Sequence, residues 1–163
     1  MELNKDWLFV DGDKMYNFRG SGVLIHENKL LVQRGINDTD YALTGGQVKF
    51  GETSAETVVR EYKEEMGAVV LADRLIWVEE SFWKWGQRDC HTICHYHLLK
   101  LKNPAQIPLD GTFKSSENDE SRLLFTWIPL FELTGFQETI YPVFIKEKIF
   151  NIKDGIEHFI YRE

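Results

Sequence analysis

The stretch from Gly46 to Ala68 reads G-Q-V-K-F-G-E-T-S-A-E-T-V-V-R-E-Y-K-E-E-M-G-A and contains the clearest helix signal in the chain. Thr53 and Glu56 have the spacing of a capping box, and Gly67 stands where a helix often ends on a glycine. We therefore predict a helix over residues 53–66. Its core-facing stripe should consist of Ala55, Val58, Val59, Tyr62 and Met66.

Three carboxylates share an adjoining face of this predicted helix. Glu61, Glu64 and Glu65 lie at spacings i, i+3 and i+4, where like charges destabilise a helix by about 0.2–0.5 kcal/mol per pair. One interpretation is a solvated acidic face. The other is a divalent-cation site, because Mg²⁺ takes carboxylate oxygens, keeps several waters and bridges to substrate phosphates.

Strand-like segments surround the helix on both sides. The residue pattern predicts a hairpin from 15–25 and 30–32, a short strand at 41–43 that ends at the Gly45-Gly46 pair, two long strands at 69–85 and 89–101, and a buried strand at 123–128. It also predicts a polar loop over 103–121, a second helix over 142–150, and a final strand or ordered tail over 156–161. We expect one α/β-type layered domain spanning 1–163.

The composition narrows the class of protein. The chain has 163 residues, of which 43% are apolar, and its 19 Lys and Arg against 26 Asp and Glu give a net charge of −7. A binder of nucleic-acid polymers needs a basic stripe, so this balance argues against one. Neither a secretory signal nor an apolar run long enough to cross a bilayer is evident, and we expect a cytoplasmic protein with no membrane partner.

The segment 90–97 combines cysteines with histidines. In a strand, Cys90 and Cys94 share a face but lie about 13 Å apart, which is too far for a common zinc ion, so free core thiols are expected. On the other face, one of His91, His95 and His97 could line a substrate pocket. Most nearby aromatic side chains should be core, but a nucleobase needs a stacking platform. The candidates for that platform are Phe82, Trp83 and Trp85.

The stretch quoted above resembles the Nudix motif G-x5-E-x7-R-E-U-x-E-E-x-G-U, where U is a bulky aliphatic residue. Every Gly, Glu and Arg position of the motif is matched, by Gly46, Glu52, Arg60, Glu61, Glu64, Glu65 and Gly67. Tyr62 and Ala68 depart from the aliphatic positions, and Thr44 stands where Pro often precedes the two glycines. The segments 15–32, 77–83 and 127–133 resemble other parts of the same family.

This resemblance implies a fold, a reaction and a set of ligands. The fold would be a Nudix-type α/β/α sandwich with a mixed β-sheet between helices. The reaction would be hydrolysis of a nucleoside diphosphate linked to another group, with Mg²⁺ or Mn²⁺ as cofactor. The cation would be held by Glu61, Glu64 and Glu65, with a carbonyl ligand from Gly46 or its neighbour Gly45, while Glu52 and Arg60 would pair to hold the loop against the helix.

The resemblance leaves the general base open. Glu61 or Glu64 on the helix is one candidate, and a carboxylate of the downstream loop is the other. That loop offers Glu117, Asp119 and Glu120, of which Glu120 is preferred because it lies nearest the following strand.

The resemblance also leaves the substrate open. ADP-ribose hydrolases of the family often carry Pro about 16 residues after the motif, and dinucleoside polyphosphate hydrolases carry Tyr near there, whereas this chain has Lys84 and Trp85. A nucleoside triphosphate or a nucleotide sugar remains, bound through Phe82, Trp83, Trp85 or His91. Homodimers are common in the family. The alternative function is a non-catalytic nucleotide-binding sensor, which the loss of a motif Glu would favour, but none is lost.

Overall fold

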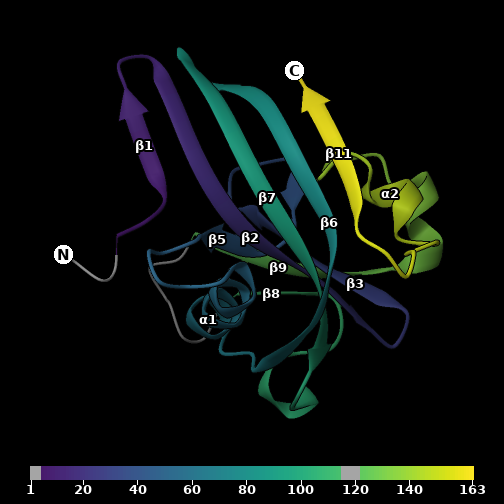
Figure 1. Ribbon diagram of the computed structural model, residues 1–163. Coiled ribbons are helices and arrows are strands. Elements are labelled where there is room, and N and C mark those ends of the chain that lie inside the picture. Colours follow the sequence, from purple (N-terminus) through teal and green to yellow (C-terminus); the bar gives the residue numbers. More distant parts are fainter. Residues whose placement is uncertain (1–4, 115–121) are drawn as a thin grey trace.

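A mixed β-sheet forms the body of the molecule (Figure 1). The computed structural model describes residues 5–114 and 122–163, and in these ranges eleven strands pair with one another. The main path through the sheet runs β10-β4-β3-β2-β7-β6-β11. The strands are β1 (Leu8–Asp11), β2 (Lys14–His26), β3 (Lys29–Gly35), β4 (Tyr41–Ala42), β5 (Gly45–Gln47), β6 (Val70–Trp85), β7 (Arg88–Leu101), β8 (Thr112–Lys114), β9 (Leu123–Pro129), β10 (Ile140–Tyr141) and β11 (Glu157–Arg162).

Strand β2 is the hub of the sheet. It pairs in parallel with β7 over eleven residue pairs, from Lys14 opposite Asp89 to Leu24 opposite Leu99. It also pairs antiparallel with β1, β3 and β5. Strand β6 forms a long antiparallel ribbon with β7, and β11 extends the sheet in parallel with β6. The final segment, for which the sequence allowed a strand or a tail, is therefore a strand.

Helix α1 (Ser54–Met66) covers one face of the sheet and begins and ends as the sequence predicts. The Thr53 side chain accepts from the Glu56 amide, and the Glu56 carboxylate accepts in turn from the Thr53 amide. Gly67 closes the helix at φ 74°, a left-handed conformation that glycine adopts without steric cost. The helix buries Val58, Tyr62 and Met66 in a core cluster with residues of β2, β3, β7 and β9.

The opposite face is covered more thinly. There α2 (Ile145–Lys148) packs Ile145 and the following Ile149 into a second core cluster with Trp77 and Tyr96. Figure 1 shows α1 and α2 on different sides of the sheet. The fold is thus the predicted α+β arrangement, a mixed sheet between helices, with a second helical layer of about one turn.

Two sequence predictions were wrong in detail. The second helix does not span 142–150, because four residues suffice to bury its apolar side chains and the segment is rich in β-branched and aromatic residues with modest helix propensity. The predicted loop 103–121 contains the 3₁₀ turn η1 (Pro104–Gln106) and strand β8, which pairs with β9. A further 3₁₀ segment, η2 (Leu130–Gly135), follows β9. None of the helices in the described ranges is long and apolar enough to cross a membrane.

Candidate active site

Arg60 organises the acidic face of α1. Its Nε donates to Glu52 Oε1 at 2.7 Å and its Nη2 to Glu52 Oε2 at 3.1 Å, so the two side chains form a bidentate pair between loop and helix. Its Nη1 donates to Glu61 Oε1 at 2.7 Å and to Glu64 Oε2 at 3.1 Å. One guanidinium thus orients three carboxylates, while a further bond from Nη2 to the Gln47 carbonyl oxygen ties the group to β5.

The pair between Glu52 and Arg60 is electrostatically strong. The Arg60 guanidinium lowers the pKa of Glu52 to about 2, and the carboxylate raises the pKa of Arg60 in return. The hydroxyl of Thr57 also donates to Glu52 Oε2 at 2.8 Å. Both charged side chains therefore stay ionised over the whole physiological range, as expected of a rigid support.

Gly46 leaves room for the Glu61 carboxylate. A Cβ atom at position 46 would lie 2.1 Å from Glu61 Oε1 and 2.3 Å from its Cδ, closer than any real contact. Glu61 is accordingly only 14% exposed, whereas Glu64 is 56% exposed. The first glycine of the sequence motif thus allows a close approach between β5 and α1.

Burial raises the pKa of two of the helix carboxylates. For Glu61 the desolvation outweighs the lowering effect of Arg60, and for Glu65 the nearby charges of Glu61 and Glu64 add to it. The Oε2 atom of Glu65 is buried and has no hydrogen-bond partner among the described residues. Desolvated, mutually repelling carboxylates with an unsatisfied oxygen are an environment that a bound cation would stabilise.

The donor set fits a hard divalent cation. Carboxylate oxygens, which Glu61, Glu64 and Glu65 supply, are its preferred ligands. Within residues 5–114 and 122–163, no three Asp, Glu, His or Cys side chains are already placed close enough together to hold a metal ion. Arg60 draws Glu61 and Glu64 toward itself, so the arrangement suits an ion that keeps several of its waters, as Mg²⁺ does.

The residues that depart from the sequence motif serve packing. Tyr62 is fully buried, and its hydroxyl donates to the Gly22 carbonyl oxygen at 3.2 Å. This bond satisfies the buried hydroxyl, a polar group that the usual aliphatic residue does not have. Ala68 is fully buried in the same core cluster. These substitutions leave the acidic face of α1 unchanged.

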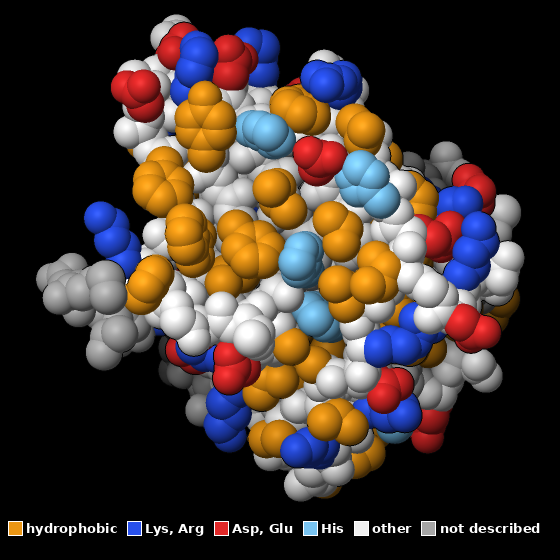
Figure 2. Space-filling view, in the orientation of Figure 1, with side chains coloured by type: hydrophobic (Ala, Val, Ile, Leu, Met, Phe, Trp, Pro, Cys, Tyr) orange, Lys and Arg blue, Asp and Glu red, His pale blue; other side chains and the backbone are white. Residues whose placement is uncertain are grey.

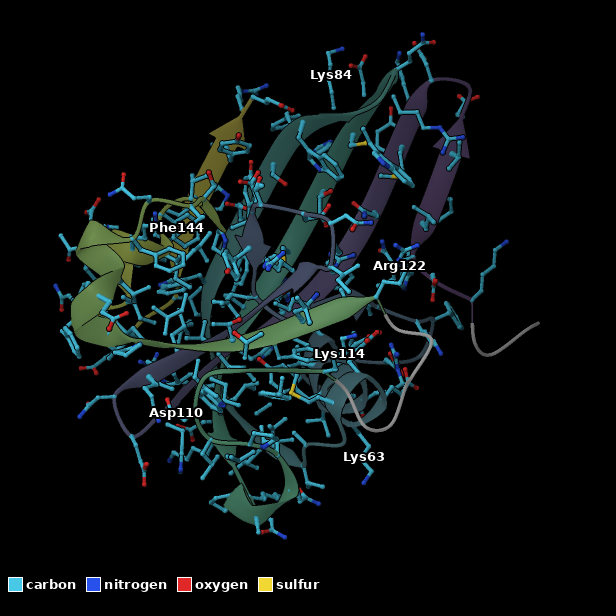
Figure 3. All side chains as sticks on the ribbon, turned by 180° about the vertical axis from the view of Figure 1, so that it is seen from behind. Lys63, Lys84, Asp110, Lys114, Arg122 and Phe144 are labelled. Carbon is cyan, nitrogen blue, oxygen red and sulfur yellow. The ribbon has the colours of Figure 1, made fainter. Side chains whose placement is uncertain are left out.

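A cavity of about 690 Å³ opens on the sheet face opposite α1. Its inner end is lined by Gln47, which directly follows Gly46, and by Arg19, which pairs with Gln47 across β2 and β5. Figure 3 views the molecule from this side, with Lys84, another lining residue, at the outer ends of β6 and β7. The cavity therefore runs from the neighbourhood of the carboxylates toward the far end of the sheet.

Alternating residues of β2, β7 and β6 form the cavity floor in cross-strand rows. One row holds Arg19, Cys94 and Glu79, and the next holds Asn17, Thr92 and Ser81. Aromatic side chains form the walls, namely Trp83, Trp85, Tyr96, Tyr141 and Tyr161. Sequence reasoning overlooked Arg19, Asn17 and Glu79, although their alternation along β2 and β6 with residues of the other sheet face was a usable signal.

The predicted substrate-binding residues are divided between the two faces. Trp83 and Trp85 line the cavity, and Trp83 Nε1 donates to Thr92 Oγ1 at 3.0 Å. Phe82 and His91 stack on each other on the other face, with ring centroids 4.2 Å apart. Figure 2 shows this face, where histidine and hydrophobic side chains gather above α1.

The remaining histidines and cysteines of the 90–97 segment are buried or half-buried. His95 Nδ1 and His97 Nε2 lie 3.0 and 2.9 Å from the Ser54 hydroxyl at the start of α1. Cys90 and Cys94 are buried free thiols, as predicted. The candidate bases Glu117, Asp119 and Glu120 fall in 115–121, outside the described residues, and their role stays a prediction.

Comparison with known proteins decides the family. A family model described as the NUDIX domain matches residues 17–146. The chain belongs to the NUDIX family. It is therefore a hydrolase of phosphoric anhydride bonds, the class of enzyme that the motif predicts.

Curated NUDIX relatives carry related names. The chain is 26% identical over 152 residues to an RNA pyrophosphohydrolase of a Marinomonas species, covering 86% of this chain and 94% of the relative. It is 34% identical over 80 residues to a putative ADP-ribose pyrophosphatase of Bacillus subtilis, covering 49% of this chain and 36% of the relative.

Solved NUDIX structures share the fold. A mutator MutT protein from Bacillus halodurans superposes with a TM-score of 0.63 at 15% identity, covering 89% of each chain. An ADP-ribose pyrophosphatase from Streptococcus suis gives a TM-score of 0.55 at 15% identity, covering 88% of this chain and 98% of the other. At these identities the likeness concerns the fold alone.

Proposed function

We propose that this NUDIX protein hydrolyses the pyrophosphate linkage of a small nucleotide, either a nucleoside triphosphate or a nucleotide sugar, with Mg²⁺ or Mn²⁺ as cofactor. The observation that carries the proposal is the constellation around Arg60. There Glu61 packs against Gly46, and Glu65 has a buried oxygen without a partner in the part of the chain that the structure describes. A solvated acidic face would need neither the glycine nor the buried oxygen.

Glu61, Glu64 and Glu65 hold the cation, with the Gly46 carbonyl as a further ligand. The cation, when bound, neutralises phosphate charge and lowers the pKa of a coordinated water. Arg60 positions Glu61 and Glu64 and takes its own orientation from Glu52, so it supports the ligands rather than binding substrate. Arg19 and Gln47 line the inner end of the cavity, where the phosphates of a bound nucleotide would lie.

The proton of the attacking water needs a carboxylate acceptor. Glu64 is the most accessible candidate on α1, and Glu61 is the alternative there. Glu120 is the rival from the downstream loop. If Glu120 is the base, Glu120→Gln loses turnover while cation affinity, measured by calorimetry, stays at the wild-type value.

The walls of the cavity supply the nucleoside site. Trp83 and Trp85 offer stacking surfaces for a base, and the size of the cavity, about 690 Å³, is typical of small-molecule sites. We place the base here rather than against Phe82 and His91, which stack on each other on the opposite face.

The test is a panel of nucleoside triphosphates and nucleotide sugars, followed by ³¹P NMR with Mg²⁺, with Mn²⁺ and with chelator. The proposal predicts cleavage of at least one nucleotide at the anhydride bond and its loss with chelator. Tight binding of a nucleotide without any cleavage would instead support the sensor alternative. Cleavage that persists in chelator would contradict the cation site.

A further inference from the structure

Glu79 is a buried carboxylate on the cavity floor that the reaction does not use. It is only 7% exposed, and its one hydrogen bond within residues 5–114 and 122–163 comes from the Tyr96 hydroxyl, which donates to Oε1 at 3.2 Å. No cationic side chain of the described ranges forms an ion pair with it. Burying a carboxylate with so few partners is costly unless a ligand supplies further donors.

The strand register orders the polar groups of the floor. Gln47, Arg19, Cys94 and Glu79 lie opposite one another across β5, β2, β7 and β6. Three strand spacings separate the ends of this row, about 14 Å. Arg19, the cation of the row, lies next to the catalytic end, and Glu79 lies at the other. Phosphates bound near Arg19 would be repelled by Glu79, so the nucleoside end of the substrate faces the carboxylate.

A neighbouring amide is held in a defined orientation. Trp83 Nε1 donates to Thr92 Oγ1, and the Thr92 hydroxyl donates to Asn17 Oδ1. This series of hydrogen bonds engages the amide oxygen of Asn17, so the amide nitrogen is the donor that this lining residue can offer to a ligand. The floor thus presents a carboxylate with two acceptor oxygens and, in the adjoining row, an amide donor.

Among the four common bases, only guanine carries two adjacent N–H donors on its Watson–Crick edge, N1–H and the N2 amino group, beside the O6 acceptor. A carboxylate can accept from both donors at once, in the bidentate manner of strong charged hydrogen bonds. We propose that Glu79 selects the base of the substrate and that this base is guanine. The inference rests on the proposed function and names the substrate class within it.

The test compares kcat/KM for GTP, ITP, ATP, CTP and UTP in the wild type and in Glu79→Gln. The wild type should favour GTP, with ITP intermediate because inosine lacks the N2 amino group. Glu79→Gln should lower kcat/KM for GTP about tenfold to hundredfold, the usual effect of a hydrogen bond to a charged group, and leave ATP nearly unchanged. The matched control is Glu80→Gln, which makes the same change on the other face, where Glu80 Oε2 lies 2.8 Å from His158 Nε2.

In an active enzyme, two kinetic results would overturn the inference. One is no preference for GTP in the wild type; the other is an equal loss for all five nucleotides in Glu79→Gln, which would place the carboxylate on the ribose. Tyr96→Phe provides a second variant, since it keeps the aromatic ring and removes only the hydroxyl that orients Glu79. In this variant the ratio of kcat/KM for GTP to kcat/KM for ATP should fall several-fold.

Equilibrium binding separates this inference from the proposed function. Tryptophan fluorescence reports binding directly, because Trp83 and Trp85 line the cavity. If the wild type cleaves no nucleotide, the proposed function fails, yet tighter binding of GDP than of ADP that Glu79→Gln abolishes would still support the base selection. Equal affinities for GDP and ADP would contradict it even in an active enzyme.

Discussion

The acidic face of α1 and the floor of the cavity use carboxylates in opposite ways. On α1, Glu52, Glu61 and Glu64 are all held by one arginine, and the group is stiff and highly charged. On the cavity floor, Glu79 has no cationic partner among the described residues and lies among neutral polar and aromatic side chains. We assign the chemistry to the first region and the recognition of substrate to the second.

The two regions also differ in how the chain builds them. The residues of the acidic face come from 22 consecutive positions, from Gly46 to Gly67, so helical spacing alone brings them together. The floor collects single residues from β2, β6 and β7, which strand register places side by side. Because we assign the chemistry to the first region and substrate recognition to the second, substitutions in the first should change kcat and those in the second KM.

The largest expected effect is that of Glu61→Gln. Loss of a buried cation ligand should lower kcat about a thousandfold, comparable to the loss of a key electrostatic group in other active sites. The matched control on the same helix is Glu56→Gln, which keeps a side chain that can serve in the capping box. Steady-state kinetics at saturating Mg²⁺ provides the measurement, and wild-type kcat in Glu61→Gln would exclude the residue as a ligand.

Next in size is the contribution of Glu52 to stability. Its pKa is lowered to about 2 from an ordinary 4.5, so its pairing with Arg60 stabilises the fold fully above pH 4.5, and this stabilisation is lost as the pH falls through about 2. Urea unfolding should show Glu52→Gln about 3 kcal/mol less stable than wild type at pH 7. The difference should shrink below pH 4, and a difference independent of pH would contradict the ion pair.

Gly46→Ala should lower kcat about a hundredfold, because the new Cβ would occupy the position of the Glu61 carboxylate. The neighbouring change Gly51→Ala is an informative contrast. A methyl group at position 51 would have no atom of the described residues within 4 Å, but Gly51 adopts φ 90°, so its substitution should cost stability rather than kcat. Parallel kinetics and thermal unfolding of both variants separate the two effects.

The smallest expected effect belongs to the cavity. Trp83→Phe keeps an aromatic wall but removes the Nε1 donor to Thr92, and should raise KM about tenfold or less at unchanged kcat. Phe82→Leu, one residue earlier on the opposite face, should leave both constants unchanged. A larger effect from Phe82→Leu than from Trp83→Phe would reverse our assignment of the substrate face.

Sequence reasoning succeeded where the signal was local. The bounds of α1, its caps and the shared face of Glu61, Glu64 and Glu65 follow from residues within one helix. It failed where tertiary packing decides. Alternation in a strand shows that Phe82 and Trp83 face opposite ways, but not which of the two faces α1 covers.

The same limit applies to Glu79. Alternation along the strand shows that one of Glu79 and Glu80 shares the face of Trp77, Ser81 and Trp83. It does not show that this residue is buried, because its burial depends on β7 and on the register that places Cys94 and Tyr96 beside it.

The apolar spacing of 142–150 correctly indicated core residues, since Ile145 and Ile149 are both buried in the core. The length of the helix, in contrast, was set by packing.

The most direct test of the division between chemistry and recognition is a pair of measurements on Glu64→Gln: the rate of nucleotide cleavage in Mg²⁺, and the affinity for the same nucleotide in the absence of divalent cations, followed by tryptophan fluorescence. The account predicts a loss of turnover of at least a hundredfold together with wild-type affinity, because the cavity that binds the nucleoside is intact. Wild-type turnover in this variant, or a loss of cation-free affinity equal to the loss of rate, would contradict it.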